Sequence, residues 1–228
     1  MVLIVGHRGA PTLASENTLA SVERAIEVGA DAVEVDVRLS RDGHAMVFHD
    51  LDMKRLTGVD AKITELTLEE LRKLRVQGRE PIPTLEEVLE LVKKYGVELL
   101  IEVKDPRATP RVLELVKNVG MCSSTYITSF YHSVALEVLR IEPRIRRGLI
   151  VVGELVSFGD AIRVTKAHHV ANHYNYVTPR FVEAIHRADA KVYAWTVNSV
   201  ATARRLVELG VDAIVTDMPQ VMVREFRG

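Results

Sequence analysis

Short apolar runs, rich in valine and isoleucine, recur along the whole chain. Such continuous runs are typical of parallel strands that are covered on both faces, whereas half-exposed strands alternate apolar and polar residues. The runs predict eight buried strands at residues 2–5, 32–37, 99–103, 126–129, 148–152, 168–172, 191–196 and 213–216.

Between these strands the apolar positions follow helical spacing, most clearly at residues 18–28, 84–95, 110–119, 133–140, 179–188 and 199–209. Gly29, Gly96, Gly120 and Gly210 each follow the last periodic residue, where a left-handed cap position favours glycine. Strands that alternate with helices predict a parallel α/β fold. Eight such repeats predict a single (β/α)8 TIM-like barrel that spans residues 1–228.

The pair Asp42-Gly43 predicts a tight hairpin turn after the second strand. If these two residues form the turn, the run at 45–49 returns antiparallel beside the second strand and His49 lies opposite Asp36. This β-hairpin extension lies above the rim and is not one of the eight barrel strands. Residues 50–83 then form a short insertion with one helix at 68–75, for which we weigh two roles, a substrate-shaping lid and a passive surface loop.

The bulk composition argues against several partners. Apolar residues make up 47% of the chain and charged residues 27%, while a net charge of −1 offers no global attraction to nucleic acid or anionic lipid. The apolar run at residues 1–5 is too short to span a membrane, so we expect no nucleic-acid partner and no stable membrane insertion. The single cysteine, Cys122, favours a cytoplasmic location. The sequence does not indicate an oligomeric state.

Polar residues at the C-terminal ends of the predicted strands carry the candidate chemistry, because this end of a TIM barrel holds the active site. They are His7 and Arg8 after the first strand, Glu34 and Asp36 on the second, Glu102 and Lys104 on the third, and Trp195 with Asn198 at the end of the seventh. Residues two apart on a strand share a face, so Glu34 lies beside Asp36 and Glu102 beside Lys104.

The three carboxylates, Glu34, Asp36 and Glu102, predict a divalent-metal site. Held about 5 Å apart, they repel each other by about 3 kcal/mol per pair at an effective dielectric constant of about 20. A bound cation relieves this repulsion, and oxygen-only ligands favour Mg²⁺ or Ca²⁺, with Mn²⁺ as an alternative, over zinc. Arg8 and Lys104 bring the site with its cation to a net charge of about +1, which suits a phosphodiester monoanion.

His7 and His49 complete this hypothesis. Imidazole exchanges protons near neutral pH, with an ordinary pKa of about 6.5, so the two rings can serve as base and acid beside a metal-bound phosphate. The sequence has no glycine-rich P-loop, which argues against nucleotide-driven phosphoryl transfer.

Four aromatic or histidine positions carry weaker signals. Trp195, at a strand end, is expected to form a wall of the site, with a place in the core as the alternative. His168, His169 and His173 cluster near the sixth strand, but their spacing fits no standard metal-ligand pattern, and we assign them no catalytic role.

Nine motif pieces occur in order along nearly the whole chain, and together they resemble the glycerophosphodiester phosphodiesterase family in its compact prokaryotic form. The pieces are His7-Arg8-Gly9, Glu16-Asn17-Thr18, Glu34-Val-Asp36, Asp42-Gly43, His49-Asp50, Glu102-Val-Lys104, Ser129-Phe130, Trp195-Thr-Val-Asn198 and Thr216-Asp217. One departure from the family pattern is Ser15, where the family commonly has proline before Glu-Asn-Thr.

The resemblance implies a TIM-like barrel that binds one divalent cation through Glu34, Asp36 and Glu102. It also implies that His7 and His49 are the catalytic acid and base, with Arg8 and Lys104 on the phosphate. In the family the glycerol hydroxyl of the substrate is thought to attack phosphorus, and water then opens the cyclic phosphate. The expected partner is a small glycerophosphodiester, and the products are glycerol 3-phosphate and an alcohol.

Two alternatives stay open at this point. The same constellation could cleave lysophospholipids as a phospholipase D. Apolar side chains of residues 51–83 in the lining of the site would favour this alternative. The chain could also be a phosphate-binding module without catalysis, although the presence of both histidines, all three acids and Lys104 argues against that.

Overall fold

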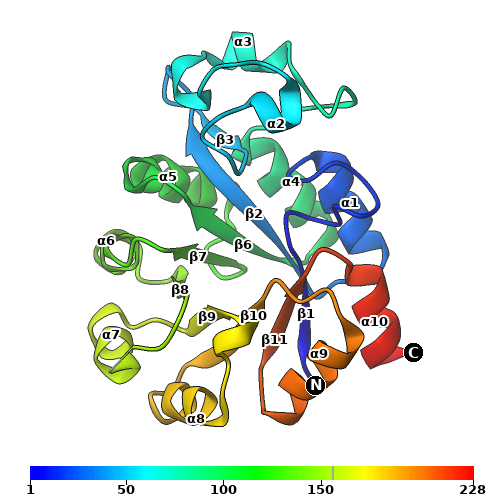
Figure 1. The fold of residues 1–228 in the computed structure, drawn as a ribbon. Helices are drawn as coiled ribbons and strands as arrows, with labels where there is room; N and C mark the ends of the chain where they lie inside the picture. The colour runs from blue at the N-terminus through cyan, green and yellow to red at the C-terminus, as the bar shows by residue number, and fades with distance from the viewer. Residues whose placement is uncertain (156) are drawn as a thin grey trace.

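The computed structural model describes residues 1–155 and 157–228 and shows a closed barrel of eight parallel strands (Figure 1). β1 pairs with β2 on one side and with β11 on the other, which closes the sheet. The barrel strands are β1 (Leu3–Gly6), β2 (Ala32–Leu39), β6 (Glu98–Val103), β7 (Thr125–Ser129), β8 (Arg146–Val151), β9 (His169–His173), β10 (Lys191–Trp195) and β11 (Ala213–Thr216). All the predicted strands are present with small shifts at their ends, and the predicted TIM-like barrel is confirmed.

Helices surround the barrel and cover the outer face of the strands (Figure 1). They are α1 (Leu19–Glu27), α4 (Leu85–Tyr95), α5 (Thr109–Val119), α6 (Ser133–Ile141), α7 (Phe158–Thr165), α8 (Pro179–Arg187), α9 (Val200–Glu208) and α10 (Pro219–Arg227). The sequence pattern predicts all of these except α7 and α10. α7 is short and has Gly159 in its first turn, which weakens its helical pattern, and α10 follows the last strand of the barrel.

The hairpin after β2 is present, but its register differs from the predicted one by one residue. β3 (Ala45–Val47) runs antiparallel to β2 with Met46 opposite Arg38, and the backbone N–H of Phe48 donates to the carbonyl of Asp36 over 3.0 Å. Phe48 therefore takes the position predicted for His49, and the prediction that His49 lies opposite Asp36 is wrong.

The register differs because the turn has three residues, Arg41, Asp42 and Gly43, whereas the prediction assumed a two-residue turn of Asp42 and Gly43. The N–H of Gly43 donates to the carbonyl of Ser40 over 3.1 Å, and Gly43 takes a left-handed conformation with φ of 82°. This is the usual end of a loop of that length. The Asp42 carboxylate accepts hydrogen bonds from the Ser40 hydroxyl at 2.6 Å and from the backbone N–H of Leu68 at 3.1 Å, which ties the turn to the insertion.

The segment from residue 50 to 83 folds against the hairpin above one side of the barrel (Figure 1). Its elements are α2 (Lys54–Thr57), a 3-10 turn (Ile63–Glu65), α3 (Leu68–Arg72), and a small antiparallel pair, β4 (Arg75–Val76) with β5 (Glu80–Pro81). The predicted helix at 68–75 is thus shorter than expected. A further 3-10 turn lies at Pro106–Ala108 before α5 and another at Tyr174–Tyr176 after β9.

This segment has an apolar core of its own, which includes two side chains of the hairpin region. The core consists of Met46, Phe48, Met53, Leu56, Ile63, Leu71, Val76 and Ile82. Burial of these side chains explains why a segment with few regular elements is nevertheless ordered beside the rim.

Inside the barrel, alternate strand residues meet in an apolar cluster that is separate from the layer between strands and helices. It consists of Val5, Ala32, Leu100, Tyr126, Ile150, Ala171, Tyr193, Ala213 and Val215. Glu34 and Glu102 each follow a member of this cluster by two residues on the same strand, Ala32 on β2 and Leu100 on β6. In the part of the chain that the structure describes, no helix combines the length and apolar character needed to cross a membrane.

Candidate active site

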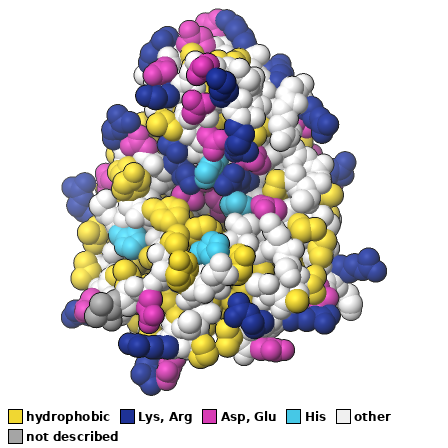
Figure 2. Space-filling view, in the orientation of Figure 1, with side chains coloured by type: hydrophobic (Ala, Val, Ile, Leu, Met, Phe, Trp, Pro, Cys, Tyr) yellow, Lys and Arg dark blue, Asp and Glu magenta, His cyan; other side chains and the backbone are white. Residues whose placement is uncertain are grey.

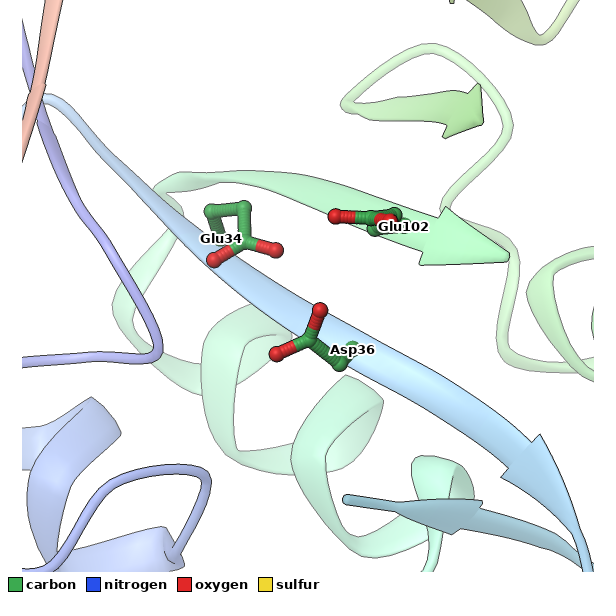
Figure 3. Close-up of side chains that lie close together, drawn as sticks. All are labelled: Glu34, Asp36 and Glu102. Carbon is green, nitrogen blue, oxygen red and sulfur yellow. The ribbon is translucent and has the colours of Figure 1, made fainter. Parts of the chain in front are cut away.

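Three carboxylates from neighbouring strands meet at the C-terminal end of the barrel (Figure 3). Glu34 and Asp36 lie on β2, and Glu102 lies on β6 in register with Asp36. One oxygen from each side chain lies within 4.8 Å of the others. Glu34 and Asp36 are buried, and the side chain of Glu102 is only 12% exposed. The predicted cluster is therefore assembled in the structure.

The charges of this cluster are not balanced by the protein alone. Burial, together with the charge of Asp36, raises the pKa of Glu34 to about 8 and also raises the pKa of Glu102. Burial would raise the pKa of Asp36 as well, but the charges of Lys104 and Arg8 outweigh it and lower that pKa to about 2. Ionising all three groups at neutral pH thus requires more positive charge, and an oxygen-only donor set at this spacing fits a hard divalent cation.

Lys104 and Arg8 supply the positive charge that surrounds the cluster. Lys104 Nζ lies 2.7 Å from Glu102 Oε1 and 3.3 Å from Asp36 Oδ1. Arg8 Nε lies 3.2 Å from Asp36 Oδ2, and Arg8 Nη1 donates to Glu16 over 2.7 Å. Both cations line the same cavity as Glu34 and Glu102, so an anion there meets two positive side chains.

The loop after β1 has an unusual backbone, which explains the sequence His7-Arg8-Gly9. Arg8 has φ of 55° and Gly9 has φ of 87°, both in the left-handed region. A Cβ on Gly9 would lie 2.4 Å from Ser21, so only glycine fits there. This conformation directs the backbone N–H of Arg8 to Glu34 Oε2 at 2.9 Å. The loop therefore holds one carboxylate of the cluster in place.

His7 is oriented by an acid from the other end of the chain. His7 Nδ1 and Asp217 Oδ1 are 2.6 Å apart, and Asn198 Nδ2 donates to the second oxygen of Asp217 over 2.6 Å. Burial alone would lower the pKa of His7, but the bond to Asp217 and the charge of Glu34 outweigh it, and the pKa is raised. The other ring nitrogen, Nε2, is not used by Asp217 and remains available for a reacting group.

His49 reaches the cavity although it is not a strand partner of Asp36. β3 ends at Val47, and the chain then bends so that His49 lines the cavity with Glu34 and Glu102. His49 Nδ1 lies 2.7 Å from Asp50 Oδ1. Burial lowers the pKa of His49 and outweighs the charge of Asp36. The two histidines therefore differ, since His7 holds its proton more tightly than His49.

Arg55 links the insertion to both sides of this arrangement. It donates to Glu16 through Nη1 and Nη2, at 3.0 and 2.8 Å, and to Asp50 Oδ2 through Nε at 2.6 Å. Glu16 in turn pairs with Arg8, and Asp50 holds His49. The insertion thus supports the side chains that face the cavity.

Several residues have positioning roles that the sequence did not predict. These are Asp217 and Asn198 behind His7, Asp50 and Arg55 behind His49, and Glu16 and Asn17 near Arg8 and Asp36. All except Arg55 occur in the motif pieces. The motifs could therefore have identified these residues. No motif includes Arg55, whose partners Glu16 and Asp50 lie on other elements.

A cavity of about 310 Å³ connects these groups. In the space-filling view, histidine side chains lie near the centre of the face, with charged side chains on the insertion side and hydrophobic ones on the opposite side (Figure 2). Trp195 lines the cavity and packs edge-on against Phe130, with ring centroids 5.8 Å apart. The cavity is therefore polar and charged on one side and aromatic on the other, which suits an amphipathic phosphodiester.

Comparisons with known proteins agree with this arrangement. A model of the glycerophosphoryl diester phosphodiesterase family matches residues 7–221. A glycerophosphodiester phosphodiesterase of Caldanaerobacter subterraneus subsp. tengcongensis is 31% identical, over 99% of this chain and 98% of that protein.

Two solved structures are also similar over nearly their whole length. A phosphodiesterase of Oleispira antarctica, in complex with the product sn-glycerol-3-phosphate, is 29% identical with a TM-score of 0.94, over 99% of this chain and 97% of that one. A glycerophosphodiester phosphodiesterase of Thermotoga maritima is 30% identical with a TM-score of 0.86, over 98% of each chain. The chain belongs to the glycerophosphoryl diester phosphodiesterase family.

Proposed function

We propose that this protein hydrolyses glycerophosphodiesters to glycerol 3-phosphate and an alcohol, with His7 and His49 as its catalytic acid and base. One observation carries the proposal: both histidines line a single cavity with Glu34, Glu102, Arg8 and Lys104. Membership of the family supports the reaction class.

Glu34, Asp36 and Glu102 are the proposed ligands of one divalent cation, Mg²⁺ or Ca²⁺, with Mn²⁺ as an alternative. When bound, such a cation neutralises charge on a phosphate oxygen and stabilises charge that develops in the transition state. Asp36 Oδ1 is buried and has no hydrogen bond within the described residues, although Lys104 lies nearby. An oxygen without a hydrogen bond inside a carboxylate cluster supports a metal ligand at that position.

The two histidines act in sequence on protons. Neutral His49 accepts the proton of the attacking glycerol hydroxyl as its oxygen forms the bond to phosphorus, and protonated His7 donates to the oxygen of the leaving alcohol as that bond breaks. Water then opens the cyclic phosphate with the two roles reversed. The directions of the two pKa shifts support this order, and Arg8 and Lys104 hold the phosphate oxygens through charge.

Trp195 is proposed as an apolar wall for the substrate, supported by its place in the cavity and its contact with Phe130.

The alternative of a lysophospholipase D loses its distinguishing feature, because no residue from 51 to 83 is among those that line the cavity. The apolar side chains of that segment are buried in its own core. Assembly of the complete constellation also speaks against a module that only binds phosphate.

We further propose that residues 1–228 work as one catalytic domain on a small soluble substrate. The free thiol of Cys122 suits a reducing compartment, which supports a cytoplasmic location.

Release of glycerol 3-phosphate tests the function directly. Purified protein, freed of metal and then supplied with Mg²⁺, Ca²⁺ or Mn²⁺, is expected to release it from glycerophosphocholine and glycerophosphoethanolamine with at least one of these ions. A coupled assay for glycerol 3-phosphate provides the measurement. Micellar lysophosphatidylcholine provides the comparison, and turnover of that lipid alone would contradict the proposal.

The pH profile of kcat/KM is expected to be bell-shaped, because activity needs neutral His49 and protonated His7. The acid limb follows the lowered pKa of His49 and the alkaline limb follows the raised pKa of His7. Asp217→Asn removes the carboxylate that raises the pKa of His7, so the alkaline limb should move to lower pH. Steady-state rates measured across the pH range give both limbs.

Asp50→Asn is the matched control, since it removes the acid that supports the pKa of His49. It should move the acid limb to lower pH and leave the alkaline limb in place. If both variants shifted the same limb, the assignment of one limb to each histidine would be wrong.

A further inference from the structure

The cavity continues below the carboxylates into the interior of the barrel. Leu100 lies two residues before Glu102 on β6, and it lines the cavity together with Ile150, Ala171 and Val215, all members of the interior cluster. Barrel interiors are normally filled by large branched side chains. Here the cavity reaches this layer, and a histidine, His169, is among the side chains that line it.

His169 is fully buried, at 0% exposure, and both of its ring nitrogens lack a hydrogen-bond partner among the residues that the structure describes. Its ring stacks on Tyr193 with centroids 4.2 Å apart and meets the edge of Tyr126 at 5.5 Å. Arg146 donates a hydrogen bond to the hydroxyl of Tyr126. No hydrogen bond joins the hydroxyl of either tyrosine to the imidazole in the described part of the chain.

The backbone of β8 makes room for this ring. Gly148 is the register partner of His169, and a Cβ on Gly148 would lie 2.1 Å from His169 Nε2. Any other residue at 148 would displace the imidazole. The ring therefore occupies a space that only glycine leaves open.

A second polar group without a partner lies on the other side of Gly148. Thr128 on β7 is also in register with Gly148, its side chain lines the cavity, and its hydroxyl has no partner in the described part of the chain. A buried polar group without a partner destabilises the folded protein, so such groups are rare. Because both residues line one cavity, a ligand group that enters this cavity is the nearest source of a partner for them.

The chemistry of the ring limits what this group can be. Burial lowers the pKa of His169 to about 3, so the imidazole is neutral at physiological pH. A neutral imidazole offers one donor and one acceptor, and threonine offers one of each as well. Neither side chain offers a charge of its own to pair with an anion or an ammonium group. An uncharged hydroxyl, which both donates and accepts, satisfies the pair.

We propose that His169 and Thr128 form a subsite for an uncharged hydroxyl group of the substrate, below the position of the phosphate. The subsite rests on the proposed function, since its ligand is a glycerophosphodiester. The hydroxyl belongs either to the glycerol that remains on the phosphate or to a polyol leaving group. The hydrogen bonds are the same in both cases, and substrates with and without a hydroxyl on the leaving group distinguish them.

His169→Leu tests the proposal, because leucine has similar volume and no polar atom. We expect kcat/KM to fall about tenfold or more for a substrate whose hydroxyl uses the subsite. The melting temperature should stay unchanged or rise, since a polar group without a partner is removed from the interior. Thr128→Val is the second variant, which changes only a hydroxyl for a methyl group. Ile150→Val is the matched control on the apolar wall. It should lower kcat/KM slightly, and by the same factor for every substrate.

The substrates are glycerophosphoglycerol and the propanol diester of glycerol phosphate, which lacks hydroxyls on the leaving group. A loss confined to glycerophosphoglycerol places the hydroxyl on the leaving alcohol. An equal loss on both, together with weaker inhibition by glycerol 3-phosphate, places it on the glycerol. Either result supports the subsite.

Other outcomes overturn it. If both variants keep wild-type kcat/KM on both substrates, the cavity floor holds only water. If His169→Leu loses activity in step with a large fall in melting temperature while Thr128→Val is unchanged, His169 is structural. Failure of the wild-type protein to release glycerol 3-phosphate would instead contradict the proposed function, so the two failures are distinguishable.

Discussion

His7→Ala and His49→Ala are each expected to lose roughly 10³-fold or more of turnover without loss of the fold. Each ring is the proposed carrier of one proton in the reaction, and neither is a member of an apolar core cluster. The rate of glycerol 3-phosphate release measures the first effect. Thermal unfolding and divalent-ion binding measure whether the structure and the carboxylate cluster survive.

His44→Ala is the control for these variants. His44 lies in the hairpin close to His49 in sequence, but its side chain is 41% exposed and pairs with Asp42 instead of lining the cavity. Its replacement should leave turnover within a factor of about two. Wild-type rates in either His7→Ala or His49→Ala would remove that histidine from the mechanism.

The barrel was predictable because its strands are buried on both faces. Runs such as residues 32–37 must be apolar where they contact the helices, so the polar Glu34 and Asp36 on one face stand out. The same period of two places all the carboxylates on the inner face. This argument needs only local sequence, so it predicted the cluster of Glu34, Asp36 and Glu102 correctly.

The hairpin register could not be derived in the same way. A two-residue and a three-residue turn both suit Asp42-Gly43, and the choice depends on the contacts of Asp42 with Ser40 and Leu68. His49 still reaches the cavity because β3 ends before it, so its position depends on the bend after Val47 and not on strand pairing. The conclusion about the residue was right and the geometric reason for it was wrong.

The supporting contacts were also beyond local sequence. Asp217 lies 210 positions from His7 along the chain, and only closure of the barrel brings the two together. His169 gave no recognisable pattern, because its meaning depends on Gly148 in the neighbouring strand. Such partnerships follow from topology, and pattern reading on one strand cannot detect them.

Glu102→Gln is expected to weaken divalent-ion binding by roughly 10–100-fold or more, because it replaces one of three charged oxygen ligands with a neutral amide. Isothermal calorimetry on metal-free protein measures the change. The affinity of the wild-type protein should also rise with pH up to about 8, because burial and the charge of Asp36 raise the pKa of Glu34 to about 8. The ion must displace that proton to bind.

Stability of the metal-free protein should show the opposite trend with pH. A carboxyl whose pKa is raised by folding binds its proton more tightly in the native state, so stability falls as pH rises from the ordinary value of 4.5 toward about 8. Glu102→Gln removes one repelling charge, so this fall should be shallower in the variant even as its metal binding weakens. Glu98→Gln is the control on the same strand, since Glu98 pairs with Arg146 away from the cluster and should change neither curve. Unchanged affinity in Glu102→Gln would contradict the ligand set, whereas weaker binding together with a shallower pH dependence of stability would tie both effects to one cluster of charges.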